Sequence, residues 1–365
     1  MLPANWENVL VVQTSFLGDT VLTLPLLSEI KRRYPAGKLT LLCAPVAAEL
    51  LGSHEVIDEV MVDDKRRQDA GILGLWRKAK VLEQKKFTLA ISPHKSLRSA
   101  LLLFLARIPR RVGFQQSKGA FLFHDLADRN PGRHDVERNL SILQPLGIRT
   151  EKCRRNLDLP AVDAGREQSR HLLQARGVDP NKTVIGINAG SVWPTKRWSP
   201  DLFAQLIRKF KENLNGEIVL FGGPEDHETV AAIQALCGTE IVNWCGKTSL
   251  RDLPAAVSAC DLFITNDSGP MHIAVACGVP VVAIFCATTP SLGFYPYTSK
   301  AVVVQKDLPC RPCSSHGGRR CPLGTEDCIK LVRPEDVLQA AIQMLQVKDR
   351  MPPDSNTHHP QVLNL

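Results

Sequence analysis

A short polar turn between two apolar runs contains residue types that bind phosphate. The turn at residues 266–269 (NDSG) follows the apolar run 262–264, and Pro270 then begins a helix of small residues. Bare N–H groups and a helix N-terminus at the carboxyl end of a strand favour a bound anion. The turn also fits an ordinary strand-to-helix connection, with Asp267 or Ser268 as the N-cap.

A second turn, SFLGDT at residues 15–20, places a carboxylate at the start of a helix. Gly18 permits a close approach of the backbone, and Asp19 lies where the helix begins. An aspartate of ordinary pKa is ionised at neutral pH, so Asp19 could act as the general base for an attacking sugar hydroxyl. Helix capping would also explain Asp19, and the turn lacks the G-x-G-x-x-G pattern of dinucleotide sites.

Two further loops could bind the rest of a nucleotide. Residues 190–198 (GSVWPTKRW) combine hydroxyl groups with a lysine, which suits a phosphate, although the spacing is not that of a Walker A loop. Residues 222–228 (GGPEDHE) place Asp226 and Glu228 where a carboxylate can accept hydrogen bonds from a ribose. The alternatives are a surface loop and an acidic first helical turn.

Four of the eleven cysteines are close together in the sequence, in a segment that contains several glycines. They form the pattern C-x2-C-x7-C-x6-C and are Cys310, Cys313, Cys321 and Cys328. Four thiolates could close a tetrahedral zinc site, but the second pair is spaced more widely than the common C-x2-C. Zinc binding, disulfides and reduced thiols are all compatible with this pattern, and no catalytic role is expected for it.

The elements that must position these residues alternate between strands and helices, which predicts α/β domains with doubly wound parallel sheets. The first half has strand-like runs at 9–13, 39–43, 56–62, 88–92 and 110–114, and helix-like runs at 20–33, 46–51, 73–84, 97–106 and 134–146. Residues 115–131 have no clear periodicity. The second half has strand-like runs at 183–189, 217–221, 240–245, 262–264 and 280–287, and helix-like runs at 164–175, 200–211, 227–237, 250–259 (with Ser249 as N-cap), 271–277 and 334–345.

This alternation predicts two domains of similar size. The N-terminal domain is expected at residues 1–165, and the C-terminal domain at 166–347, including the Cys-rich segment 310–328. Residues 348–365 are polar with three prolines and are expected to form a disordered tail.

The charge distribution points to an anionic partner for the first domain. The net charge is +8, and residues 1–160 carry 25 Lys and Arg against 17 Asp and Glu, whereas the later residues are balanced. A nucleic acid, a phosphorylated molecule or an anionic membrane surface would suit this excess. No apolar run is long enough to span a bilayer and no signal peptide is recognisable, so a cytoplasmic location is expected.

Taken in order, four segments resemble glycosyltransferase family 9, the ADP-heptose:lipopolysaccharide heptosyltransferases. The segments are residues 9–35, 93–114, 186–200 and 265–285. The likeness extends over about residues 8–346, and four motifs in order are more specific than any one alone. The Cys-rich segment is similar to the heptosyltransferase II branch of this family.

The resemblance implies a GT-B fold, in which two Rossmann-like domains face each other across a cleft. It implies inverting transfer of a heptose from ADP-heptose to the lipopolysaccharide inner core, with Asp19 as the catalytic base and no cofactor. The donor-binding residues would be Ser191, Thr195, Lys196, Glu228 (or Asp226), Thr248, Asp267, Ser268, Gly269 and His272. The acceptor-binding candidates are Ser15, Gly18, Lys95, Arg98 and Arg138, together with Arg110 and Arg111.

The implied partners are the ADP-heptose donor and a phosphorylated lipid A-core acceptor. The enzyme would therefore touch the cytoplasmic face of the inner membrane peripherally, and no nucleic acid is expected. Two other functions fit parts of the sequence: a GT-B sugar-nucleotide epimerase, and a non-catalytic protein that binds nucleotides or nucleic acid. The low aromatic content of 5% argues against single-strand binding, which uses stacking side chains.

Overall fold

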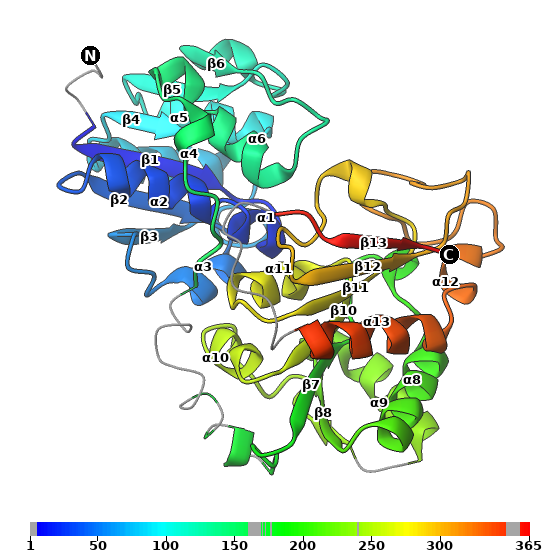
Figure 1. Ribbon diagram of the computed structural model, residues 1–365. Helices are drawn as coiled ribbons and strands as arrows, with labels where there is room; N and C mark the ends of the chain where they lie inside the picture. Colours follow the sequence, from blue (N-terminus) through cyan, green and yellow to red (C-terminus); the bar gives the residue numbers. More distant parts are fainter. Residues whose placement is uncertain are drawn as a thin grey trace. The chain divides into compact units, whose positions relative to one another are not determined.

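The computed structural model describes residues 6–159, 169, 171, 173–175, 177–238, 241–347 and 358–365. Contacts divide the chain into two units, Met1–Pro160 and Ala161–Leu365, and each unit contains one parallel sheet flanked by helices (Figure 1). The predicted α/β fold with two Rossmann-like units is therefore confirmed. The expected domain boundary at 165/166 falls outside the described residues.

The sheet of the first unit has six parallel strands in the order β3-β2-β1-β4-β5-β6. This is the strand order of a dinucleotide-binding Rossmann fold, in which ligands bind at the carboxyl ends of the strands. The strands are β1 (Asn8–Gln13), β2 (Lys38–Cys43), β3 (Glu59–Val62), β4 (Leu89–Ile91), β5 (Arg110–Phe114) and β6 (Asp125–Ala127). Residues 9–13 and 39–43 are fully buried, as expected for central strands with both faces covered.

The helices of the first unit are shorter than the sequence predicts in two places. The helix expected at 20–33 is two helices, α1 and α2, because Pro25 begins a new helix rather than continuing the first. The helix expected at 134–146 stops at Ser141 and continues as the short 3-10 turn η2 around Pro145. The helices are α1 (Leu17–Val21), α2 (Leu24–Arg33), α3 (Pro45–Leu51), α4 (Gly71–Gln84), α5 (Leu97–Leu105) and α6 (Asp135–Ser141), with 3-10 turns η1 (Ala120–Leu122), η2 (Gln144–Leu146) and η3 (Thr150–Lys152).

The sheet of the second unit has seven parallel strands in the order β13-β12-β11-β10-β7-β8-β9. Three central strands, β11, β10 and β7, lie side by side, so the loops after them meet at one edge. The strands are β7 (Thr183–Asn188), β8 (Gly216–Phe221), β9 (Val242–Asn243), β10 (Leu262–Asn266), β11 (Val281–Phe285), β12 (Ala301–Gln305) and β13 (Gln361–Asn364).

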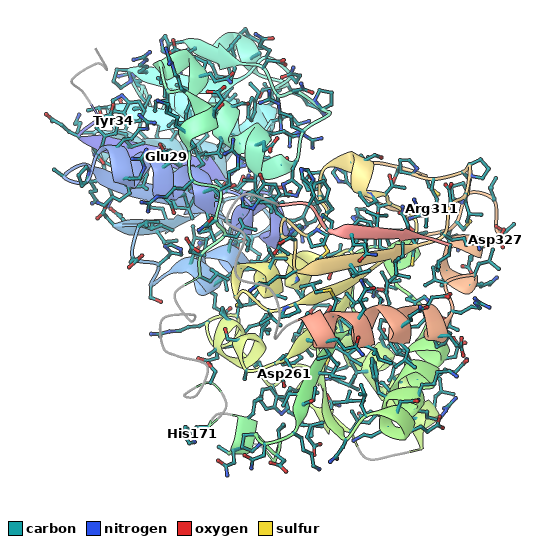
Figure 2. The ribbon with its side chains drawn as sticks, in the orientation of Figure 1. Glu29, Tyr34, His171, Asp261, Arg311 and Asp327 are labelled. Carbon is teal, nitrogen blue, oxygen red and sulfur yellow. The ribbon has the colours of Figure 1, made fainter. Side chains whose placement is uncertain are left out.

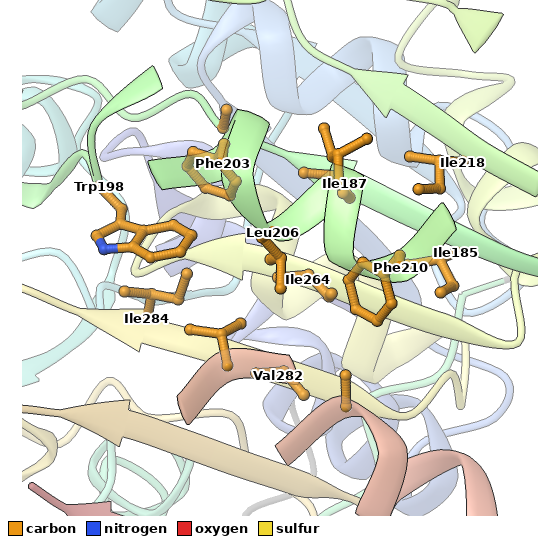
Figure 3. Close-up of a cluster of buried hydrophobic side chains, with 14 of the residues drawn as sticks. Ile185, Ile187, Trp198, Phe203, Leu206, Phe210, Ile218, Ile264, Val282 and Ile284 are labelled. Carbon is orange, nitrogen blue, oxygen red and sulfur yellow. The ribbon is translucent and has the colours of Figure 1, made fainter. Parts of the chain in front are cut away.

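One large core holds the helices of the second unit on this sheet. Trp198 and the α8 residues Phe203 and Phe210 pack against strand residues such as Ile264 and Ile284 (Figure 3). Fully burying such side chains stabilises a fold by about 1.5–3 kcal/mol each. The helices are α8 (Pro200–Asn213), α9 (His227–Cys237), α10 (Leu253–Ser258), α11 (Gly269–Ala276), α12 (Asp327–Lys330) and α13 (Pro334–Val347), with 3-10 turns η5 (Pro194–Lys196), η6 (Pro224–Asp226) and η7 (Pro290–Leu292).

Two expectations for the second unit need correction, and a third lies mostly outside the described residues. Residues 358–365 are not a disordered tail: β13 pairs with β12, and residues 348–357 lie outside the described part of the chain (Figure 1). Helix α10 begins after Asp252, because the Ser249 hydroxyl bonds the Asp252 backbone and carboxylate in a turn before the helix. The helix expected at 164–175 lies mostly outside the described residues. Within the described ranges, no helix is long and apolar enough to cross a bilayer.

Candidate active site

The predicted phosphate loops of the second unit meet through an ion pair. Lys196 lies in the loop after β7, and Asp267 lies in the turn after the adjacent strand β10. The Lys196 ammonium is 2.7 Å from Asp267 Oδ2, and the two side chains are only 14% and 6% exposed. The buried Asn266 side chain fixes the two loops together, since it donates to Ala189 O and accepts from Trp198 N.

The loop after β11 adds a third contact to the Asp267 carboxylate. The Thr288 hydroxyl donates to Asp267 Oδ2 at 2.6 Å. Arg311, in the segment after β12, donates to Thr288 O and Phe285 O and so holds this loop (Figure 2). A lone carboxylate would repel a phosphate, but here its charge is balanced by Lys196. Asp267 therefore positions the lysine and does not cap α11.

The first turn of α11 has no side-chain cap. Ser268 occupies the N-cap position, but its hydroxyl contacts Thr265 Oγ1 at 3.2 Å and not the helix backbone. Gly269 and Pro270 follow at the start of the helix. The amide groups of an uncapped helix start and the helix dipole favour an anionic ligand. This uncapped helix start is compatible with the anion site that the sequence predicts, which stays a prediction.

His272, on the first turn of α11, is neutral at physiological pH. Burial lowers its pKa to about 4, with Asp267 raising the pKa and Lys196 lowering it. The side chain is 4% exposed, and its Nδ1 atom has no hydrogen-bond partner in the described part of the chain. A neutral imidazole beside Lys196 and Asp267 can exchange a hydrogen bond with a ligand without adding charge.

The residues predicted near the nucleoside differ in their accessibility. Asp226 is 6% exposed; burial raises its pKa, and its Oδ2 accepts a hydrogen bond from Gly223 N. Glu228 is exposed in the first turn of α9. Thr248 is half-buried, and its hydroxyl has no partner in the described residues. Of the two carboxylates that the sequence leaves open, Glu228 is the one available to a ligand.

The Cys-rich segment braces the lysine loop. Gly317 has a φ of +83°, and a Cβ placed there would lie 2.8 Å from Lys196 Cγ. Gly318 N donates to Thr195 Oγ1 at 2.8 Å, and Thr195 N donates back to Gly318 O. Thr195, predicted to bind the donor, is thus 7% exposed and bonded to this segment. Ser191 is 9% exposed, and its carbonyl accepts from Arg197 Nε.

The four cysteines of this segment carry free thiols. Cys310 is exposed, Cys313 and Cys321 are half-buried, and Cys328 is buried with its pKa raised to about 11 by burial. No group of three or more His, Cys, Asp and Glu side chains could hold a metal ion in the ranges that the structure describes. In this conformation the segment acts as a brace for Lys196.

In the first unit, Asp19 lies in the first turn of α1, after β1. Its Oδ2 accepts hydrogen bonds from the Ser15 hydroxyl and from Phe16 N, so the carboxylate closes a capping box. Asp19 and Ser15 are half-buried, whereas Gly18 is buried. Capping and a catalytic role are compatible, because capping fixes one oxygen and leaves the carboxylate partly accessible.

A second carboxylate near Asp19 was missed by the sequence analysis. Asp135, at the start of α6, is 2% exposed and pairs with Arg129. Burial raises its pKa, Arg129 lowers it, and the nearby charge of Asp19 raises it. The Lys95 side chain is exposed overall. Partial burial and the charges of Arg129 and Arg138 lower its pKa, whereas Asp135 raises it. The motif HDVER at residues 134–138 predicts the start of a helix, but nothing in it indicates that Asp135 lies near Asp19.

A histidine in the same unit was also missed. His94 Nδ1 lies 3.2 Å from Thr14 Oγ1 and 3.0 Å from Ser99 Oγ, and burial lowers its pKa to about 4. Thr14 precedes Ser15 in the turn that leads to Asp19, so a neutral imidazole supports this turn.

The predicted acceptor arginines are mostly engaged in the fold. Arg98 donates to Asp63 Oδ1 at 2.9 Å and to the carbonyl of Asp69 at 2.7 Å. Arg138 is 4% exposed and donates to Asn130 O and Pro131 O. Arg110 pairs with Asp125, and Arg111 donates to Leu122 O and Ile108 O. Among the predicted acceptor cations, Lys95 has no ion-pair partner in the described residues and is the most available to a ligand.

Comparison with protein families gives a match over more than half of the chain. The model of glycosyltransferase family 9 (heptosyltransferase) matches residues 75–322. This range includes Lys196, Asp267 and His272, and it begins after Asp19.

Relatives and solved structures agree with this match. The chain is 28% identical over 338 residues to lipooligosaccharide heptosyltransferase 2 of Campylobacter jejuni, covering 91% of this chain and 96% of that protein. It is 31% identical over 285 residues to lipopolysaccharide heptosyltransferase 3 of Escherichia coli K12, covering 74% and 80%. The crystal structure of a family 9 glycosyltransferase from Veillonella parvula is similar with a TM-score of 0.83, 26% identity and coverage of 94% and 98%.

Proposed function

Because the chain belongs to glycosyltransferase family 9, the heptosyltransferases, we propose that it transfers a heptose from ADP-heptose to the inner core of lipopolysaccharide. Two relatives named as heptosyltransferases of lipopolysaccharide and lipooligosaccharide support this substrate class. The branch is that of heptosyltransferase II, in keeping with the Campylobacter relative.

The observation that carries the donor assignment is the Lys196–Asp267–Thr288 arrangement beside the uncapped start of α11. The diphosphate of the donor would accept hydrogen bonds from the α11 amides and from Lys196, whose ammonium has protons beyond the one that Asp267 holds. Neutral His272 would add one hydrogen bond. Glu228 would accept from the ribose, and Thr248 would lie near the adenine.

The reaction is an inverting displacement with Asp19 as general base. The acceptor hydroxyl attacks the anomeric carbon as Asp19 takes its proton, the new C–O bond forms, and the bond to the diphosphate breaks. ADP leaves with the bonding electron pair, and Lys196 and the start of α11 stabilise its negative charge. Ser15 and Phe16 N hold the carboxylate in place for the proton transfer.

The acceptor is a phosphorylated lipid, so the basic first half of the chain has an anionic partner. Lys95 is the cation of that half best placed to meet an acceptor phosphate, since it is exposed near Asp135, which in turn lies near Asp19. The enzyme would work as a peripheral protein on the cytoplasmic face of the inner membrane.

The test is ADP release from purified protein mixed with ADP-heptose and heptosylated lipid A core. Asp19→Asn should lower kcat by at least about 10³-fold and leave ADP binding within about twofold, because the base is lost and the donor site is not touched. Asp128→Asn, an exposed aspartate of the same unit, is the matched control. Wild-type turnover by Asp19→Asn would remove Asp19 from the mechanism. Release without an acceptor, or no release at all, would favour an epimerase or a binding protein instead.

A further inference from the structure

Helix α4 of the first unit exposes large apolar residues near its N-terminal end. Its buried residues Leu75, Ala79 and Leu82 join the core, as expected for a helix on a sheet. On the outside, Ile72, Leu73 and Trp76 are 84%, 78% and 54% exposed. Single exposed apolar residues are ordinary, but a run of large ones on one helix indicates a contact surface.

Neighbouring elements extend this apolar area. Arg98, at the start of α5, donates to Asp69 O and Gly71 O, so the first turns of α4 and α5 adjoin. Leu97 is 46% exposed and lies close to Gly119, two residues before Phe121, which is 80% exposed. We call Ile72, Leu73, Trp76, Leu97 and Phe121 the α4 apolar surface.

The charges around the α4 apolar surface are positive. Arg77 and Lys80 lie on the exposed side of α4, and the Lys80 ammonium is 5.8 Å from the centre of the Trp76 ring. The one carboxylate of α4, Glu83, is compensated by Lys80 at 2.8 Å and Arg107 at 3.3 Å. Exposed Trp and aliphatic residues interspersed with Lys and Arg are typical of helices that lie in a membrane interface.

We infer that the α4 apolar surface inserts shallowly into the headgroup region of an anionic phospholipid bilayer. A second copy of the chain fits less well, because the positive charges of Arg77 and Lys80 from both copies would lie in one interface, whereas an anionic bilayer is complementary to them. The N-terminal ends of α4 and α5 lie at the carboxyl edge of the sheet, the edge at which Asp19 follows β1. A lipid-borne acceptor would thus be presented at the edge that carries the base. This inference deepens the proposed function and rests on it for the identity of that acceptor.

The test is sedimentation of the full chain with vesicles of phosphatidylcholine and phosphatidylglycerol (7:3), compared with phosphatidylcholine alone. The wild type should bind the anionic vesicles, and Ile72→Ser/Leu73→Ser/Trp76→Ser should bind at least about tenfold more weakly. Leu236→Ser, an apolar residue of the second unit that is 49% exposed, is the matched control and should bind as the wild type does. Arg77→Glu/Lys80→Glu should weaken binding to the anionic vesicles alone.

Fluorescence gives a second readout that does not depend on a folded triple variant. Trp6, Trp198 and Trp244 are buried, whereas Trp193 of the second unit is half-buried. A blue shift of emission on adding anionic vesicles should disappear in Trp76→Phe and persist in Trp193→Phe, which assigns it to Trp76. Wild-type binding by the triple variant, an equal loss in Leu236→Ser, or a dimer that the triple substitution dissolves would overturn the inference.

Activity separates this inference from the proposed function. With a deacylated, water-soluble core acceptor, the triple variant should keep the wild-type rate, whereas with acceptor in vesicles its rate should fall. No transfer to either acceptor by the wild type would refute the proposed function, and vesicle binding would still decide the role of the α4 apolar surface.

Discussion

The ion pair between Lys196 and Asp267 allows the sharpest test of the second unit. Asp267→Asn leaves a mostly buried ammonium without its counter-charge, and Lys196→Met leaves a mostly buried carboxylate that keeps the Thr288 hydroxyl but no cation from Lys196. Breaking a buried pair from one side typically costs about 3–5 kcal/mol. Because the Lys196 side chain is 14% exposed, we expect each single variant near the lower end, about 3 kcal/mol.

The double variant, Lys196→Met/Asp267→Asn, removes both charges and should be within about 1 kcal/mol of the wild type, since replacing a whole buried pair is often neutral. The double-mutant cycle on the free energy of unfolding should therefore give a large coupling energy. The matched control is the more exposed Lys182–Glu217 pair of the same unit, at 2.8 Å, which should couple far less. Urea unfolding of the four proteins in each cycle supplies the data.

ADP titrations of the same variants separate stability from binding. Lys196→Met should bind ADP at least about tenfold more weakly, because a charge-assisted hydrogen bond contributes about 1.5–3 kcal/mol. Asp267→Asn should retain ADP binding, and saturating ADP should restore part of its stability, because the diphosphate replaces the missing carboxylate. A coupling energy no larger than that of the control pair would refute the reasoning, because it would mean that the two side chains do not interact in solution.

Two further variants test the surroundings of this pair. Gly317→Ala should raise the KM for the donor several-fold, because the residue has a φ of +83° and the new Cβ would lie 2.8 Å from Lys196 Cγ. The control Gly278→Ala, with a φ of +69° and open space around it, should lower stability alone. Equal effects of the two variants on KM in steady-state kinetics would contradict this. The folded chain keeps His272 and His94 neutral down to about pH 4, against an ordinary pKa of 6.5. Between these pH values the unfolded chain binds protons that the folded chain excludes, so the free energy of unfolding should fall as the pH is lowered from about 6.5 to 4. The fall should be less steep in His272→Asn. An unchanged slope in urea titrations of this variant would contradict the burial of the His272 imidazole.

The sheets could be predicted from the sequence because parallel strands are continuous apolar runs. The runs at 9–13, 39–43 and 183–189 each agree with a strand to within one residue at either end. The errors fall where a local signal competes with packing. Pro25 lies inside a helical pattern but begins a second helix, and the run 361–364 is too short and too close to polar residues to indicate a strand until β12 is beside it.

The site was predictable where chemistry and sheet topology coincide. The sequence predicts that Asp267 and Lys196 each follow a strand; their meeting follows from the pairing of these two strands in the structure. The roles of Arg98 and Arg138 could not be foreseen, because their partners include backbone carbonyls whose direction depends on loop geometry. The proximity of Asp135 to Asp19 could not be predicted either, because Asp135 lies 116 positions after Asp19 in the sequence and no local pattern connects them.

A carboxylate beside a phosphate site is unfavourable only if it acts alone. Lys196 is largely removed from water, and a buried charge without a partner is unfavourable. Asp267 balances the charge of Lys196 and holds it in place, and Asp267 Oδ2 already contacts Lys196 and Thr288, so it accepts less from a ligand. The pair has no net charge, so we expect the amides of α11 to supply attraction for a diphosphate in addition to the hydrogen bond from Lys196. Donor affinity should then survive side-chain changes at this edge other than those at Lys196, which both binds the diphosphate and fixes the geometry of the leaving group.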